Sequence, residues 1–176
     1  MRHWALSGAA WVAAVMAHRV WSEAPPGTLR RGLSDAASHA ALALATTLPL
    51  ASRAPTPARV LAGALVGALA IDLDHVVAAR SLRLRTCMTM PSRPPTHSVV
   101  TAGLLVSWAF RWDRPFGLGV GLGLGSHLVR DLATGGAPLF HPARIVTLPE
   151  RWAFPLALGL GAVGWWLSGR LPNAQS

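Results

Sequence analysis

Carboxylates and imidazoles gather in short polar clusters of a chain that is otherwise rich in Ala, Leu, Gly and Val. The clusters are Asp72-Leu73-Asp74-His75, Thr96-His97-Ser98 and Ser126-His127-Leu128-Val129-Arg130-Asp131. They contain three of the five Asp residues and three of the seven His residues. Burying such groups in apolar surroundings is costly unless they are paired or bind a metal ion. The pattern therefore predicts a metal site.

The spacing within the clusters favours cooperation between their side chains. Asp72 and His75 are three residues apart and His127 and Asp131 four apart, so each pair shares one face of a helix. Imidazole combined with carboxylate suits Zn²⁺, Mn²⁺ or Fe²⁺, with Mg²⁺ as a further candidate cofactor. Cys87 is the single cysteine, which argues against a thiolate zinc site. The predicted metal ligands are His39, Asp72, Asp74, His75, His97, His127 and Asp131.

Plain structural interpretations stay open for the same residues. Helix-end solvation explains a charged Asp72 or Asp74, and an intrahelical pair explains His127 with Asp131. A capping or packed histidine is the alternative for His97. Asp35, four residues before His39, is expected to cap a helix, and His39 is either a ligand or a core residue.

The elements that position these residues are predicted to be helices. Six apolar stretches, at roughly 4–18, 36–50, 60–78, 97–110, 115–133 and 152–168, are separated by Pro, Gly and Arg. Helix is the form expected in lipid, because open sheet edges are not tolerated there. We therefore expect an all-α integral membrane bundle of five to six transmembrane or membrane-embedded helices. The chain is read as a single membrane-embedded domain, 1–176, with a motif-bearing core at about 35–142 and a tail at 172–176.

Local signals refine this expectation. Thr96 follows two prolines and is predicted to cap the helix that presents His97. Gly117, Gly121 and Gly125 are four residues apart and are predicted to let a neighbouring helix approach closely. The tryptophans lie near the ends of the stretches and predict an interfacial belt, at positions 4, 11, 21, 108, 112, 152, 165 and 166.

The positive charge is distributed as in a membrane protein. The net charge is +9, and all sixteen basic residues are Arg, spread through the connections between apolar stretches. That placement favours contact with lipid headgroups over nucleic acid, which is not expected as a partner. If all six stretches span, ten Arg residues lie on one side and six on the other. The side with more Arg is predicted to be cytoplasmic, and the same numbering places all the clusters on it.

The motifs also carry a family resemblance. The order Asp-x-Asp-His, Arg-x-x-Thr-His-Ser and Ser-His-x-x-x-Asp-x-x-Thr-x-Gly resembles the bacterial membrane-bound metal-dependent hydrolases typified by YdjM. The matching residues are Asp72, Asp74, His75, Arg93, Thr96, His97, Ser98, Ser126, His127, Asp131, Thr134, Gly136 and Pro142, with His39 similar to an early family histidine. Two positions depart from the pattern: Ser92 replaces a usual His, and Pro94 stands where Gly is common. The resemblance implies a multi-pass protein of the bacterial inner membrane with hydrolase activity.

Two functions are compared. The first is a metal-dependent hydrolase that cleaves a phosphoester of an amphiphilic anionic small molecule, such as a phospholipid or prenyl phosphate, beside membrane lipid. Asp72 and Asp74 are its predicted catalytic carboxylates, and Arg93 and Arg130 would hold the anionic group. The alternative is a non-enzymatic membrane protein in which the His/Asp cluster binds a structural or transported metal. Transport is the weaker form, because the opposite half of the predicted bundle offers only Arg at its rim.

Overall fold

The computed structural model describes residues 2–90, 93–140 and 144–168, and this part of the chain is helical. The elements are α1 (Arg2–Glu23), α2 (Leu29–Ala51), α3 (Pro57–Leu69), η1 (Ala70–Leu73), α4 (Asp74–Ala79), α5 (Leu84–Met88), α6 (Val99–Trp112), α7 (Arg114–Thr134), η2 (Glu150–Trp152) and α8 (Ala153–Ser168). An isolated antiparallel bridge joins Ala137 to Val146. The expected all-α class is confirmed.

Each predicted apolar stretch lies in a helix of the structure. Pro57 stands in the first turn of α3, and Pro25 and Pro95 lie in connections where they do not disrupt helical hydrogen bonds, whereas Pro49 lies inside α2. The third stretch is divided, because 3₁₀ geometry at Ala70–Leu73 separates α3 from α4. Arg80 then adopts a left-handed conformation, with φ of 47°, and ends α4.

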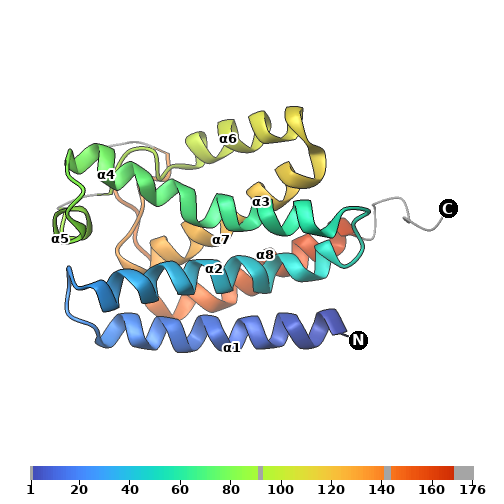
Figure 1. Ribbon diagram of the computed structural model, residues 1–176, viewed down its shortest axis with the longest axis horizontal. Coiled ribbons are helices and arrows are strands. Elements are labelled where there is room, and N and C mark those ends of the chain that lie inside the picture. The colour runs from blue at the N-terminus through green and yellow to red at the C-terminus, as the bar shows by residue number, and fades with distance from the viewer. Residues whose placement is uncertain (1, 91–92, 141–143, 169–176) are drawn as a thin grey trace.

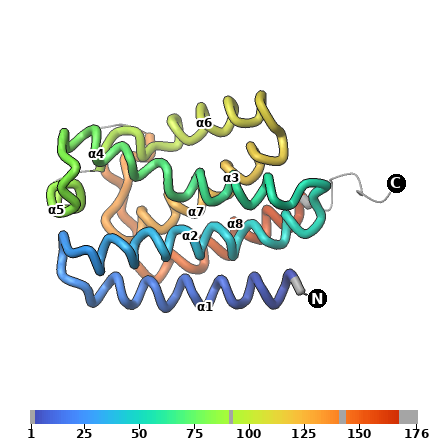
Figure 2. The backbone as a smooth tube through the Cα atoms, in the orientation of Figure 1, coloured from blue at the N-terminus to red at the C-terminus, as the bar shows by residue number. Residues whose placement is uncertain are grey.

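Successive long helices run in opposite directions along the bundle (Figure 1). α1 begins at one end, and α4 and α5 lie at the other, as the tube in Figure 2 also shows. This arrangement brings the first turns of α2, the segment from η1 to α4, the start of α6 and the last turns of α7 to one end. The ends of α2 and α6 and the start of α3 lie at the opposite end.

α3 and α7 pack with their backbones in close contact, and the glycines that permit this differ from those predicted. A Cβ at Gly119 would lie 1.9 Å from the carbonyl oxygen of Val60, and one at Gly123 would lie 2.1 Å from that of Ala64. At Gly121, from the predicted set, the nearest neighbour is a Val106 methyl at 3.6 Å. The predicted close approach is confirmed at Gly117, where a Cβ would lie 2.7 Å from the backbone of Phe110 in α6, whereas the contact with α3 is made by the other set, Gly119 and Gly123.

Among the described residues, one helical segment is both long and apolar enough to cross a membrane, the 23 residues of Pro57–Ala79. α6 is apolar but shorter. Large apolar side chains are exposed on α1 and α6, including Trp4, Val12, Leu104 and Trp108. Such extended apolar surface is what contact with lipid or a partner requires.

Candidate metal centre

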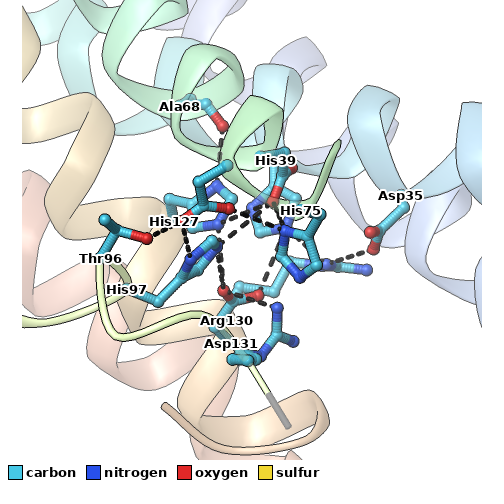
Figure 3. Close-up of polar contacts among 12 residues, drawn as sticks. Asp35, His39, Ala68, His75, Thr96, His97, His127, Arg130 and Asp131 are labelled. Carbon is cyan, nitrogen blue, oxygen red and sulfur yellow. Dashed lines mark hydrogen bonds and ion pairs between the residues drawn. The ribbon is translucent and has the colours of Figure 1, made fainter. Parts of the chain in front are cut away.

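The His and Asp side chains of four separate segments converge at one end of the bundle (Figure 3). α2 supplies His39, η1 supplies Asp72, and the loop before α6 supplies His97. α7 supplies His127 and Asp131 from its last two turns. The side chains of His97, His127 and Asp131 are fully buried, whereas that of Asp72 is 33% exposed. The site therefore has a closed inner side and an open outer edge at Asp72.

Each of two imidazole nitrogens in this cluster lies at a similar distance from the same two carboxylate oxygens. Nε2 of His97 lies 3.3 Å from Oδ1 of Asp72 and 3.6 Å from Oδ2 of Asp131. Nε2 of His127 lies 3.5 Å and 3.0 Å from the same two oxygens. Tetrahedral ligands about 2.1 Å from an ion lie about 3.4 Å from one another. The spacing of these four atoms suits a single divalent cation.

The tautomer of His127 strengthens this interpretation. Its Nδ1 donates a hydrogen bond of 2.7 Å to the backbone carbonyl of Ala68, so the neutral ring presents an unprotonated Nε2. That Nε2 faces two carboxylate oxygens and is buried without a hydrogen bond, and of the two oxygens Oδ2 of Asp131 is also paired with Nη1 of Arg93 at 2.9 Å. Lone pairs opposed in this way are costly unless a cation lies between them. A backbone carbonyl behind the imidazole is also the usual support of a metal-bound histidine.

His97 is held in a corresponding way by Asp74. The Nδ1 of His97 lies 3.0 Å from Oδ2 of Asp74, and Thr96 donates its hydroxyl hydrogen to the same oxygen. Burial lowers the pKa of His97, but its hydrogen bonds to Asp72 and Asp74 and the charge of Asp131 raise it to about 9. The helix cap predicted at Thr96 is instead Ser98, whose Oγ accepts from the backbone N–H of Thr101. Thr96 is thereby free to position Asp74.

Arg93 and Arg130, both predicted to bind substrate, occupy different surroundings. Nη1 of Arg93 lies 2.9 Å from Oδ2 of Asp131, and its side chain is 21% exposed. The side chain of Arg130 is 3% exposed, and its Nη1 donates to Oδ1 of Asp35 at 2.6 Å and to Nε2 of His39 at 2.9 Å. Arg93 therefore lies between the site and solvent, whereas the recorded hydrogen bonds of Arg130 are made to the protein itself.

Sequence reasoning missed the surroundings of Arg130. Its guanidinium lies 4.9 Å from the centroid of the Trp21 ring, and that of Arg31 lies 4.2 Å from the same ring. Trp21, predicted as part of an interfacial belt, thus supports a buried ion pair. Asp35 does not cap α2, because that helix begins at Leu29 with Thr28 as its cap.

The remaining residues of the sequence motifs end α7. Thr134 donates its hydroxyl hydrogen to the carbonyl of Arg130, and Gly136 donates its N–H to that of Asp131. Gly136 has a φ of 89°, a conformation that suits glycine, and turns the chain away from the helix. Ser92 and Pro142, both part of the motif comparison, lie outside the described residues.

The predicted ligands form overlapping groups of three whose ligand atoms lie within 4.8 Å of one another: Asp72, His97 and His127; His39, His127 and Asp131; and Asp74, His75 and His97. Two imidazoles and two carboxylates form a donor set suited to Zn²⁺, Mn²⁺ or Fe²⁺. The residues present therefore fit a divalent cation.

Comparison with known proteins identifies the family. Neither the curated proteins nor the solved structures contain a match to this chain. A family model described as YdjM inner membrane protein matches residues 35–171, which include all four segments of the site. The resemblance seen in the motifs is thereby confirmed, and the chain belongs to the YdjM family of inner membrane proteins.

Proposed function

We propose that this protein is a metal-dependent hydrolase of the bacterial inner membrane, acting on a phosphoester of an amphiphilic anionic substrate. The observation that carries the proposal is the set of four ligand atoms in which each imidazole nitrogen lies 3.0 to 3.6 Å from two carboxylate oxygens, with Nε2 of His127 buried and left without a hydrogen bond. A divalent cation bound there would supply Lewis-acid chemistry, polarising a phosphoryl oxygen and making water more acidic.

The two carboxylates expected to be catalytic have separate roles. Asp72 places Oδ1 among the four ligand atoms, and its exposed edge is where water and substrate would reach them. Asp74 uses Oδ2 to hold His97, so we assign it to positioning that imidazole. Fixing the ring in this way preserves the direction of its Nε2 lone pair.

Arg93 is the residue proposed to bind the anionic group. One of its nitrogens is engaged with Asp131, and the guanidinium offers further donors in a planar fork. Because the side chain is partly exposed, those donors are available to a phosphate that reaches Asp72. Arg130 is assigned to support of the site, since it is buried against Asp35 and His39.

An amphiphilic substrate is supported by the surroundings of the site. The family is described as an inner membrane protein, and exposed apolar side chains lie close to the site in sequence, at Leu73 and Val100. A substrate with an apolar chain and a charged head would contact both kinds of surface. We place the open edge of the site at the cytoplasmic boundary of the membrane.

One observation favours the alternative of a structural metal. Four side-chain ligands are the number found in closed structural zinc sites, whereas catalytic sites keep a position open.

The two functions are distinguished by an assay of phosphate release from phosphatidic acid and prenyl diphosphates in detergent, with and without added Zn²⁺ or Mn²⁺. The hydrolase proposal predicts phosphate release that is lost in His127→Ala and kept in His3→Ala. His3 is the control because it is an exposed histidine in the first turn of α1, far from the site along the bundle. A protein that binds metal tightly but releases no phosphate from any of these substrates would favour the structural alternative.

A further inference from the structure

We infer that the centre holds a second divalent cation, bound by Asp74 and His75 and sharing Asp72 with the first. The inference rests on the proposed function and deepens it, because it assigns how the site attracts an anionic substrate. The second position lies on the outer side of the cluster, where the side chains of Asp72, Asp74 and His75 are 33%, 16% and 17% exposed.

Two of the ligand atoms for this position, Oδ1 of Asp74 and Nδ1 of His75, are buried and have no hydrogen-bond partner. Nδ1 of His75 lies 3.0 Å from Oδ1 of Asp74, but the two are not aligned as a hydrogen bond, and neither has another hydrogen-bond partner. An ordinary His–Asp pair would direct an N–H at the carboxylate. With the proton of the His75 ring on Nε2, both atoms are acceptors, and a shared cation would satisfy them.

Asp74 divides its two oxygens between the positions. Oδ2 holds His97 and accepts the hydroxyl of Thr96, which leaves Oδ1 for the outer cation. Asp72 connects the two sets, because its Oδ1 lies 3.3 Å from Nε2 of His97 and 3.9 Å from Nδ1 of His75. A carboxylate between two sets of ligands allows two cations to lie close together, as in hydrolytic two-metal sites.

The charge of the cluster gives the second cation a function. Asp72, Asp74 and Asp131 contribute three negative charges, which Arg93 and one divalent cation balance. Asp35 adds no charge to this balance, because Arg130 pairs with it. With one cation bound, the site therefore has no net charge and does not attract a phosphate group electrostatically. A second cation leaves an excess of two positive charges, which matches a phosphate dianion.

The outer cation would be only partly enclosed. Three protein ligand atoms leave coordination positions for water or for oxygens of the substrate, as is common for Mg²⁺ and Mn²⁺ in phosphoryl-transfer sites. The inner position, with four protein ligands, would then fix the geometry, and the outer position would meet the substrate.

The number of bound Mn²⁺ ions tests this inference without an assay of activity. The full-length protein in detergent is stripped with a chelator and dialysed against Mn²⁺, and metal per chain is measured by mass spectrometry. Electron paramagnetic resonance distinguishes an exchange-coupled Mn²⁺ pair from an isolated ion with its six-line spectrum. We expect two coupled ions per chain in the wild type and in His3→Ala, and one isolated ion in His75→Ala.

Each other outcome overturns a defined part of the proposal. One isolated ion in the wild type excludes the second position and leaves the inner site standing. Two ions retained in a folded His75→Ala protein would remove His75 from the ligand set and refute the inference. No bound ion in the wild type refutes both the inference and the proposed function. If His75→Ala fails to fold, the wild-type spectrum alone decides.

Discussion

The imidazole of His39 lies parallel to that of His127, with ring centroids 3.8 Å apart and an angle of 13° between the ring planes. Nε2 of His39 accepts a hydrogen bond from Arg130, so its lone pair is already engaged. The stacked ring covers the buried side of His127 and limits its rotation. We therefore expect His39 to position a ligand and not to coordinate the inner cation, although its ring also lies within ligand distance of His127 and Asp131.

The same substitution at the two stacked positions tests this division of roles. His39→Phe keeps an aromatic ring against His127 and is expected to leave the number of bound Mn²⁺ ions unchanged. His127→Phe removes Nε2 from the four facing atoms and should lower that number by at least one. Metal content per chain of the two folded variants is the measurement. Loss of an ion from His39→Phe would make His39 a ligand.

The buried Arg130 is predicted to stabilise the fold through its ion pair. Arg130→Met leaves Asp35 and His39 without their donor, and we expect the free energy of unfolding to fall by about 2–3 kcal/mol. Arg59→Met is the control, because Arg59 also forms a 2.6 Å pair with a carboxylate, Asp113, but its side chain is 65% exposed. An exposed pair is worth about 0–1 kcal/mol. Equal losses in the two variants, measured by titration with a denaturing detergent, would contradict a special role for Arg130.

The sequence was sufficient for the long helices and for the shared end of the bundle, but not for α5, η2 or the break at η1. Proline and glycine mark the connections, and alternating directions bring Asp72, His97 and His127 to one end without knowledge of packing. The supports of the site were harder to predict. The carbonyl of Ala68 carries no signal in the side-chain pattern, and Thr96 and Ser98 are both residues that commonly cap helices. Which of the two caps α6 is decided by Asp74, because its contact with Thr96 forms only in the folded protein.

The glycine contacts show a second limit of sequence patterns. The alternate glycines of α7 form two sets, each with a spacing of four residues, and the two sets lie on different faces of the helix. The sequence does not indicate which face meets α3. The structure uses Gly119 and Gly123, because their side of α7 faces the backbone of Val60 and Ala64.

This choice of face leads to a stability prediction. Gly123→Ala places a Cβ 2.1 Å from the carbonyl oxygen of Ala64, so α3 and α7 must separate, at a cost of about 3 kcal/mol. Gly103→Ala in α6 is the control, because a Cβ there meets nothing within 4 Å. The control should be neutral or stabilising by up to about 1 kcal/mol, since alanine is the better helix former. Unfolding in detergent compares the two, and equal stability would show that α3 and α7 are not packed through this contact.

Orientation of the site in the membrane is decided by thiol accessibility at two exposed positions. Leu82 follows α4 at the site end and is 90% exposed, whereas Trp112 ends α6 at the opposite end and is 81% exposed. Single cysteines are introduced as Leu82→Cys and Trp112→Cys in a Cys87→Ser background, which removes the only native thiol. The greater number of Arg residues at the site end favours a cytoplasmic site.

The cysteine of Leu82→Cys should then resist a membrane-impermeant reagent in intact cells and react after the membrane is opened, while that of Trp112→Cys reacts from outside. The reversed pattern would place the site on the periplasmic face and leave the ligand geometry intact. Labelling of both positions from the same side would contradict a bundle that spans the membrane, because the two ends could not then lie on opposite faces.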